Sequence, residues 1–478
     1  MESCILLRYG EVAVKSRRKR PFFERLFVNA ISDALSRHEV DFDRIENLGK
    51  LYAVFPTDLE EARDVLGLVP GIESYSLAWR FSFSSKQELV DTVFDLASDA
   101  VVGKTFRVTA KRLGKQSFSS MELARDIGSM LAPKSAGVDL SNPQKTIFVE
   151  VRENQCYVFY DYIPGLGGLP PRSVGRSMAL FSGGLDSPVA AFDLLKRGCA
   201  LDYLFVNMVG DTMLSSVSKV YDFLVHRYAY NHVPRFFHVD ARKLSSYLKE
   251  SVPERLRQLA FKMALYMISE RIAREHGLSS FATGESLSQK SSQTLASLDF
   301  IQQASSMLVL RPLISRDKHD IIAIARRIGT FAASEKVKEQ CNLSEGPVTA
   351  IPSPEDLDLI PDLDGIVQEC VDSVEVFEGA LDLDTTLCIP CSEIDIGDAV
   401  VVDIRTPSVQ KKHPVGADIT TPYPAILDHL DLFTRERSYI IVCSQGVLSH
   451  ELAHILSGRN IKATALSLKE YEKFFNKE

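Results

Sequence analysis

The segment Ser-Gly-Gly-Leu-Asp-Ser at residues 182–187 constrains the fold more than any other part of this chain. A short apolar run at 178–181 precedes it, and Pro-Val-Ala-Ala-Phe-Asp-Leu-Leu follows it at 188–195. This order predicts a strand, a tight glycine turn and a helix whose first backbone N–H groups can bind a phosphate. The segment lacks the lysine of the G-x-x-x-x-G-K-[ST] loop, which argues against an ordinary nucleoside triphosphatase.

The pattern S-G-G-x-D-S resembles the pyrophosphate loop of enzymes that cleave ATP between its α and β phosphates and adenylate a substrate. The alternative is a glycine-rich turn without a ligand. Strands that alternate with amphipathic helices are expected at residues 178–181, 201–206, 235–239 and 280–283. Such alternation predicts a doubly wound parallel sheet with ligands at the carboxyl ends of its strands. Gly284 and Glu285 end the last of these strands, so we expect this segment to face the same nucleotide as the 182–187 loop.

Length and composition indicate a multidomain globular protein. The chain has 478 residues, enough for about three domains, and its 45% hydrophobic and 25% charged residues are ordinary for a soluble protein. We expect two small α+β modules over residues 1–165, the second of them beginning with a strand at 81–83. A linker rich in glycine and proline is expected over 164–171, and a last domain from about residue 398. We find no apolar run of about 18 residues and no signal-peptide pattern, which predicts a cytoplasmic protein without a membrane span.

The net charge of −8 hides an uneven distribution. Residues 345–404 contain 16 Asp or Glu and no Lys or Arg. Subtracting these 16 from the 63 acidic residues leaves 47 against 55 basic ones, so the remainder carries a charge of +8. Basic clusters at 15–20 and 111–115 would suit a phosphate backbone, and a solvated surface is the alternative for each. The acidic stretch, which contains several prolines, is expected to be a connection to the last domain.

Cys443 is the candidate nucleophile. It ends an apolar run at 439–443 and precedes a glycine-containing loop and a helix expected at 448–456. Backbone N–H donors and a helix N-terminus around a thiol lower its pKa and favour a thiolate or a persulfide. With Asp403 and Arg405 on an earlier strand, the segment resembles a rhodanese domain, whose cysteine carries sulfur as a persulfide. A buried cysteine that only packs is the alternative.

The other cysteines give weaker signals. Eight cysteines in 478 residues do not suggest a disulfide scaffold. Cys388 and Cys391 have C-x-x-C spacing, but no second pair with metal spacing is present, so we expect an incidental pair and no metal site. The context of Cys341 says little by itself. Three cysteines in apolar strand or helix-end settings are expected in the core: Cys4, Cys156 and Cys199.

Taken together, the adenylating loop, the basic N-terminal half and the rhodanese-like end resemble the tRNA 4-thiouridine synthetase (ThiI) family in its rhodanese-bearing form. Two longer motifs, at 283–295 and 310–318, resemble signatures of that family. The resemblance implies a multidomain α/β fold. Its four domains would be a ferredoxin-like α+β module at 1–57, a THUMP RNA-binding module at 58–165, a doubly wound PP-loop ATP pyrophosphatase domain at 174–390 and a rhodanese-like α/β domain at 395–478.

The resemblance also implies roles for individual residues. Asp186 and Lys318 would be needed for adenylation, Cys443 would carry the persulfide, and Cys341 would be its disulfide partner. ATP would contact nine residues: Leu180, Phe181, Ser182, Gly183, Gly184, Ser187, Lys262, Gly284 and Gln293. Lys262 lies in a helix rich in basic residues, where an exposed cation needs no function.

The activity that the resemblance implies is the conversion of uridine 8 of tRNA to 4-thiouridine with ATP and Mg²⁺. The implied partners are tRNA, a cysteine desulfurase as persulfide donor and a thiol reductant; none is a membrane. The protein could also supply sulfur for thiamine thiazole synthesis. The alternatives are a sulfur carrier that acts mainly in thiazole formation, an adenylating enzyme that thiolates another tRNA position or forms an amide, and a non-catalytic RNA-binding protein.

Overall fold

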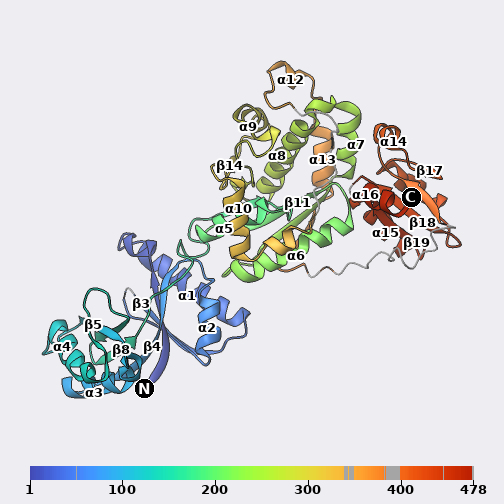
Figure 1. Cartoon of the computed structure of the whole chain (residues 1–478). Helices are drawn as coiled ribbons and strands as arrows, with labels where there is room; N and C mark the ends of the chain where they lie inside the picture. Colours follow the sequence, from blue (N-terminus) through green and yellow to red (C-terminus); the bar gives the residue numbers. More distant parts are fainter. Residues whose placement is uncertain are drawn as a thin grey trace. The chain divides into compact units, whose positions relative to one another are not determined.

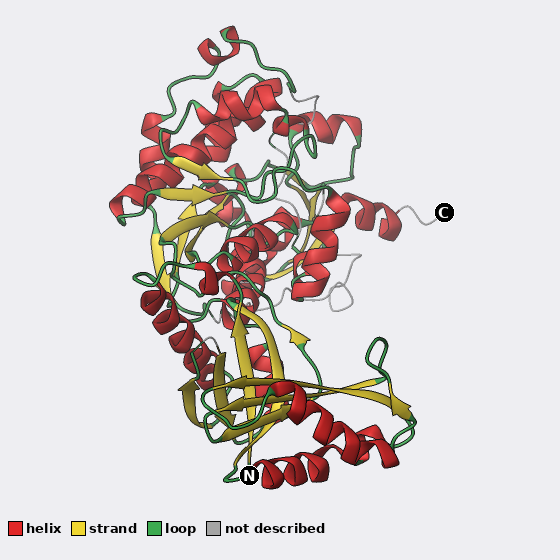
Figure 2. Ribbon diagram, turned by 90° about the vertical axis from the view of Figure 1, so that its left-hand side faces the viewer, coloured by secondary structure: helices red, strands yellow, loops and turns green. Residues whose placement is uncertain are grey.

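The computed structural model describes residues 1–49, 51–337, 343, 349–381, 383, 399–444 and 446–475. The chain divides into two compact units. The first comprises Met1–Gly175 with Leu195–Cys199 and Tyr230–His232, and the second comprises the rest. The described residues form one mixed sheet in the first unit and two largely parallel sheets in the second (Figures 1 and 2).

The first unit is built on a nine-stranded sheet. Its order is β2 (Phe42–Asn47), β3 (Leu51–Pro56), β1 (Glu2–Tyr9), β4 (Ile72–Ser82), β8 (Gln155–Phe159), β7 (Lys145–Arg152), β5 (Thr105–Leu113) and β6 (Gly137–Val138), with β9 (Ile163–Pro164) paired to β4. Its helices are α1 (Arg20–Arg37), α2 (Leu59–Leu66), α3 (Lys86–Ala97) and α4 (Ser120–Leu131).

The two expected α+β modules share this sheet, which the sequence did not predict. The strand expected at 81–83 is only the end of β4, which is eleven residues long and pairs with β1 on one side and β8 on the other. Two apolar cores lie on either side of β4. One is under α1 and α2, and the other is under α3 and α4. Because α2 packs in the same core as α1, we place the division between the modules within β4, later than the expected residue 57.

The second unit contains the expected doubly wound sheet. Its order is β14 (Leu308–Leu310), β13 (Ser280–Ala282), β10 (Arg176–Leu180), β11 (Ala200–Asn207), β12 (Arg235–Asp240) and β15 (Glu375–Glu378). Every pair is parallel except β12 with β15. The helices are α5 (Asp186–Lys196), α6 (Asp211–Tyr228), α7 (Arg242–Ser251), α8 (Arg257–Glu275), α9 (Leu295–Gln302), α10 (Lys318–Ile328), α11 (Phe331–Ser334), α12 (Glu355–Asp358) and α13 (Asp364–Asp372).

Helices cover both faces of this sheet, as β11 shows. Successive side chains of a strand point to opposite faces. Leu204 belongs to the apolar core formed with α7, α8 and α13, whereas the ring of Tyr203 packs edge-on against Tyr221 of α6. All eight residues of β11 are buried, which is the pattern of a central strand in a parallel sheet.

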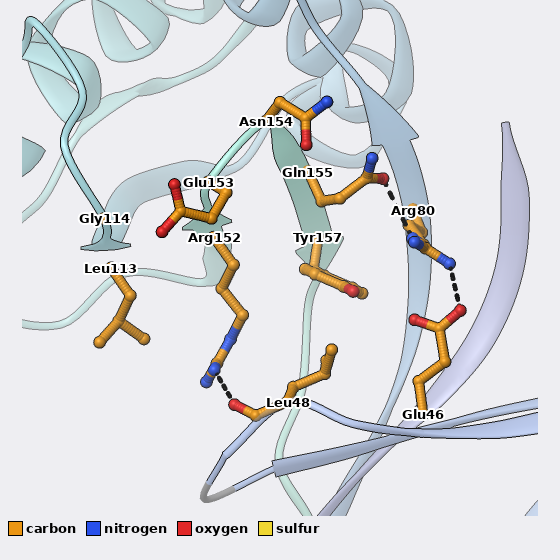
Figure 3. A pocket seen from close by; sticks show the side chains of 10 residues that line it. All are labelled: Glu46, Leu48, Arg80, Leu113, Gly114, Arg152, Glu153, Asn154, Gln155 and Tyr157. Atoms are coloured by element: carbon orange, nitrogen blue, oxygen red, sulfur yellow. Dashed lines mark hydrogen bonds and ion pairs between the residues drawn. The ribbon is translucent and has the colours of Figure 1, made fainter.

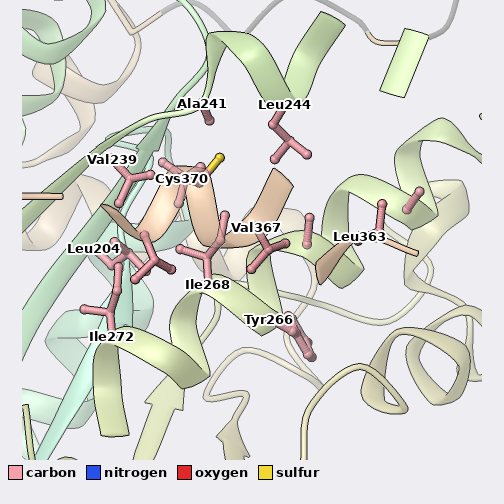
Figure 4. Packing of buried hydrophobic residues seen from close by; sticks show 14 of the residues in the cluster. Leu204, Val239, Ala241, Leu244, Tyr266, Ile268, Ile272, Leu363, Val367 and Cys370 are labelled. Carbon is pink, nitrogen blue, oxygen red and sulfur yellow. The ribbon is translucent and has the colours of Figure 1, made fainter. Parts of the chain in front are cut away.

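Part of the acidic stretch belongs to this domain, so the expectation of a simple connection is wrong for residues 364–378. Val367 and Cys370 of α13 are buried in the core beside Leu204 (Figure 4). Strand β15 adds an antiparallel edge to β12. The acidic residues stay on the surface, where Asp364 pairs with Arg271 of α8 at 2.6 Å. Glu369 likewise pairs with Lys243 of α7 at 3.5 Å, so this part of the acidic stretch is packed on the domain rather than an unpacked linker.

A separate four-stranded parallel sheet follows. Its order is β17 (Ile419–Thr420), β16 (Val400–Asp403), β18 (Ser438–Cys443) and β19 (Lys462–Ser467), with helices α14 (Pro407–Lys412), α15 (Val447–Gly458) and α16 (Leu468–Phe475). Its core includes Val402, Ile441 and Leu452. This is the α/β architecture expected for the last domain, whose rhodanese character stays a prediction. None of the helices in the described ranges has the length and apolarity needed to cross a bilayer.

Candidate active site

The 182–187 loop joins β10 to α5 as predicted. The backbone N–H of Ser182 donates to the Ser187 hydroxyl at 3.2 Å, which closes the loop over the helix start. Gly183 has a φ of +71°, and a Cβ there would lie 3.2 Å from the Cα of Val217 in α6. A side chain at this position would therefore meet both a left-handed backbone and a neighbouring helix.

Gly284 lies against this loop. Strands β10 and β13 are parallel neighbours, with Ala179 opposite Ala282, so the segments after them leave the same edge of the sheet. A Cβ on Gly284 would lie 3.1 Å from the carbonyl carbon and the Cβ of Asp186. The structure thus brings together the loop and Gly284, which the sequence expected to face one ligand.

A third loop, which follows β14, is bonded to the segment after β13 and to helix α5. The hydroxyl of Ser286 donates to the carbonyl oxygen of Arg316 at 2.6 Å, and the Arg316 guanidinium reaches Asp193 of α5 at 2.9 Å. Lys318 is the exposed first residue of α10, directly after the N-cap Asp317. Lys318 therefore stands at the end of a loop that is tied to the helix carrying Asp186.

A buried carboxylate, Glu285, lies between these loops. It accepts hydrogen bonds from Lys262 Nζ at 2.9 Å, the Tyr266 hydroxyl at 2.6 Å, the Thr283 hydroxyl at 3.0 Å and Arg311 Nε at 3.1 Å. Burial by itself would raise the pKa of Glu285, but the charge of Lys262 and the Tyr266 hydroxyl outweigh it and hold that pKa below its usual value. Lys262 is thus a paired, mostly buried cation rather than part of a solvated basic surface.

The sequence placed Glu285 beside Gly284 at the end of a strand but gave it no role of its own, and it did not single out Tyr266 or Arg311 for function. Lys262 and Tyr266 are one helical turn apart on α8, but Glu285 and Arg311 follow two different strands. Only parallel pairing of β13 with β14 makes the last two neighbours. Glu285 and Arg311 lie inside the longer motifs at 283–295 and 310–318, which was a signal in the sequence, whereas Tyr266 lies outside both motifs.

Three other residues predicted to contact ATP differ in their burial and in their local contacts. Phe181 is 1% exposed, and its ring packs edge-on against Tyr203 and Tyr221, so this side chain is part of the core. Leu180 is half-buried at the end of β10. Gln293 ends a short 3-10 helix and its amide oxygen accepts from the Lys290 N–H at 3.2 Å. Gly184 and Ser187 lie within the loop itself, and the ligand role of all these residues stays a prediction.

Cys443 is 2% exposed, and backbone N–H groups surround its sulfur as the sequence predicted; its role as a nucleophile stays a prediction. It ends β18, and its Sγ accepts from the backbone N–H groups of Gly446 at 3.0 Å and Ser449 at 3.4 Å, with the Ser449 hydroxyl also 3.4 Å away. Helix α15 begins at Val447, so its positive end faces the sulfur. The structure does not bring Cys443 into the cluster around the 182–187 loop, because β18 belongs to a separate sheet.

The neighbouring strand of this sheet supports the Cys443 segment. Arg405 is buried and makes two bonds to the Asp403 carboxylate, at 2.8 and 2.6 Å, and a third to the His413 carbonyl oxygen at 2.8 Å. These bonds tie the end of β16 to the segment that follows it, as far as His413.

The remaining cysteines divide into two groups. Cys4, Cys156 and Cys199 are buried, as expected for core residues, and so is Cys370; burial raises the pKa of Cys4 to about 12. Cys341, Cys388 and Cys391 lie outside the described residues. No set of three or more His, Cys, Asp or Glu side chains suited to a metal ion occurs within the described ranges.

The first unit carries the candidate RNA-binding surface. In the basic clusters, the residues that face solvent are Arg17, Arg18, Lys19, Lys111, Arg112 and Lys115. A pocket of about 350 Å³ lies where β2, β4, β7 and β8 meet (Figure 3). Its arginines are engaged within the protein, since Arg80 pairs with Glu46 at 2.8 Å and Arg152 binds the Leu48 carbonyl oxygen. The exposed clusters, not this pocket, offer cations to a phosphate backbone.

Comparison with known proteins decides the family. Three family models match in order: the ThiI ferredoxin-like domain at residues 4–76, the THUMP domain at 83–161 and "Thiamine biosynthesis protein (ThiI)" at 172–358. The tRNA sulfurtransferase of Pyrobaculum aerophilum is 33% identical over 97% of this chain and 96% of its own length. This chain belongs to the tRNA sulfurtransferase family. The resemblance and the fold class predicted from the sequence are thereby confirmed, apart from the rhodanese domain.

Other members of the tRNA sulfurtransferase family cover different shares of the chain. A probable tRNA sulfurtransferase of Sulfurisphaera tokodaii is 34% identical over 77% of this chain and 98% of its own length. A solved 4-thiouridine synthetase, in complex with RNA and with bound ATP, is 25% identical with a TM-score of 0.70 and covers 79% of this chain and 100% of its own. Family members of this kind thus match in full while about a fifth of this chain stays unmatched.

Proposed function

We propose that this chain is an ATP-dependent tRNA sulfurtransferase that converts uridine 8 of tRNA to 4-thiouridine. The observation that carries the proposal is the contact between Gly284 and Asp186, which assembles the glycine loop and the segment after β13 at one edge of the sheet. This is the edge at which doubly wound sheets bind nucleotides. The similar solved structure, which holds RNA and bound ATP, supports the same substrates for this chain.

The first step would be adenylation of the base. The O4 oxygen of uridine is a poor leaving group, so it attacks the α phosphate of ATP and pyrophosphate leaves. The N–H groups of the 182–187 loop would bind the departing pyrophosphate at the start of α5. Lys318 would offset the charge that develops on the phosphates. Asp186, in the 182–187 loop, would also be needed for this adenylation. Mg²⁺ would accompany ATP as its counter-ion.

The second step would be sulfur transfer. The terminal sulfur of a Cys443 persulfide attacks C4 of the adenylated base and AMP leaves, so the base is joined to Cys443 through two sulfur atoms. Cys341 as thiolate then attacks the Cys443 Sγ, which breaks the sulfur–sulfur bond and releases 4-thiouridine. The resulting Cys341–Cys443 disulfide needs two electrons from a thiol reductant before another turnover. A cysteine desulfurase would reload Cys443.

The N-terminal modules would hold the RNA. Phosphate contacts from the exposed basic clusters would fix the tRNA, and the target base would be turned out of its stack to reach the ATP site. The last domain would act as the rhodanese-like sulfur carrier. The other expected domain bounds and the cytoplasmic location remain part of this proposal, with the division between the first two modules moved from residue 57 into β4.

A sulfur carrier for thiamine thiazole synthesis is the second candidate. The description of the family model that matches residues 172–358, "Thiamine biosynthesis protein (ThiI)", favours it. Such a role would use Cys443 without adenylation of RNA. Loss of Asp186 would therefore separate the two functions, because only tRNA thiolation requires the adenylating loop.

The test is transfer of labelled persulfide sulfur to unmodified tRNA, followed by nucleoside analysis. We expect 4-thiouridine with ATP, none with a non-hydrolysable α,β analogue, and none in Asp186→Ala or Cys443→Ser. Cys199→Ser, which removes another buried thiol, is the control and should retain activity. Label that loads onto Cys443 but never reaches tRNA would support the carrier role, and label in another nucleoside would show a different target position.

A further inference from the structure

The carboxylate of Glu285 is buried in a way that calls for a physical reason. Its side chain is 8% exposed. Burial of an ionised carboxylate costs several kcal/mol unless cations and hydrogen-bond donors compensate it. Here two cations and two hydroxyl groups do so, all within 3.1 Å. The sequence thus maintains a complete polar cluster where apolar residues could have filled the space.

The two cations of this cluster are held but not fully covered. Lys262 keeps 17% of its side chain exposed and uses one of its three ammonium donors on Glu285. Arg311 bonds Glu285 through Nε, while its Nη2 donates to the Tyr266 hydroxyl at 3.0 Å and to Gln302 Oε1 at 2.9 Å. A free lysine side chain samples many rotamers, and its bond to Glu285 removes much of that freedom before any ligand binds.

The cluster lies beside the nucleotide loop. Glu285 directly follows Gly284, where an added Cβ would lie 3.1 Å from Asp186. Two cations against one carboxylate leave a net charge of +1 next to the loop that would bind phosphates. Cations fixed in place before binding stabilise an anion more than mobile ones, because no reorganisation is needed when it arrives.

We propose that Glu285 is a positioning residue, which orients the ammonium group of Lys262 toward the phosphates of ATP. The guanidinium of Arg311 compensates the negative charge of Glu285, so that the charge of Lys262 stays available to the phosphates. The inference rests on the proposed function, because it takes ATP as the ligand of this edge. In this proposal Glu285 acts through Lys262 and not by contact with ATP. Its effect on ATP binding therefore depends on the presence of that lysine.

Glu270 provides a matched control on the same helix. Its carboxylate is 16% exposed and accepts from the hydroxyl groups of Ser305 at 2.6 Å and Ser306 at 2.8 Å. These serines precede β14, so Glu270 lies at the amino ends of the strands, opposite the edge with the glycine loop. Glu270→Gln removes a comparably bonded charge from α8 without touching the proposed site.

The test is ATP affinity of the full chain with Mg²⁺, measured by calorimetry in a double-mutant cycle of Glu285→Gln and Lys262→Met. We expect Glu285→Gln to weaken ATP binding about tenfold, and to change it less than twofold when Lys262 is already methionine. Removal of a negative charge alone would tighten the binding of an anion, so weaker binding reports lost positioning rather than changed charge. Glu270→Gln should leave the affinity unchanged.

Three results would overturn the inference: unchanged or tighter ATP binding in Glu285→Gln, an equal loss in the presence and absence of Lys262, or an equal loss in Glu270→Gln. If Glu285→Gln does not fold, Glu285→Asp, which keeps the charge and shortens its reach, replaces it with the same expectations. A wild-type chain that binds no ATP would instead refute the proposed function, and the inference with it.

Discussion

Replacing Gly284 by alanine tests the close packing on which the proposed adenylation site depends. The added Cβ would lie 3.1 Å from two carbon atoms of Asp186 and 3.2 Å from the backbone nitrogen of Ser187. Carbon atoms in favourable contact are about 3.5 Å apart or more, so the start of α5 must shift by roughly 0.4 Å. Misplacement by 1 Å can cost about 100-fold in rate, so 0.4 Å corresponds to roughly sixfold slower adenylation.

The assay is tRNA-dependent pyrophosphate release in a single turnover at saturating ATP, with urea unfolding to follow stability. Gly365→Ala is the control, because no heavy atom lies within 4 Å of its added Cβ. We expect it to keep the wild-type rate, and a stability within about 1 kcal/mol of wild type. A Gly284→Ala chain that releases pyrophosphate within twofold of the wild-type rate would show that the loop tolerates the intrusion, which would refute the packing argument.

Three further predictions concern stability. Asp202→Ala should cost about 3–5 kcal/mol in urea unfolding, because it leaves Arg235, now bonded to Asp202 at 2.8 Å, without its buried partner. Burial would raise the pKa of Glu270, but hydrogen bonds from serine hydroxyls outweigh it and lower that pKa to about 2. The stability advantage of wild type over Glu270→Gln should thus be present above about pH 4.3 and vanish toward pH 2 in acid titrations. Ser449→Ala should cost about 1 kcal/mol through the lost bond to Leu466, yet leave alkylation of Cys443 by iodoacetamide nearly unchanged, because backbone donors remain.

Local patterns predicted much of the fold. The strand, glycine turn and helix at 178–195 were correct because each depends on residues close together in the sequence. The alternation that follows correctly predicted a parallel sheet, since buried parallel strands are continuous apolar runs. The eleven-residue strand β4 was mostly missed, because its buried and exposed positions do not alternate regularly. The edge strand β15, Glu-Val-Phe-Glu, carries too little apolar sequence to be recognised.

The candidate site, like the fold, was predicted from the sequence only in part. The sequence by itself determined the glycine loop, the cysteine at the end of β18 and the family, because a phosphate-binding turn and a nucleophile loop are each encoded in one short segment. Only the tertiary structure decided that Gly284 touches Asp186 and that Glu285 joins Lys262 to Arg311. The physical reason is that these residues come from segments after different strands and from a separate helix, and only the pairing order of a parallel sheet brings such segments to one edge.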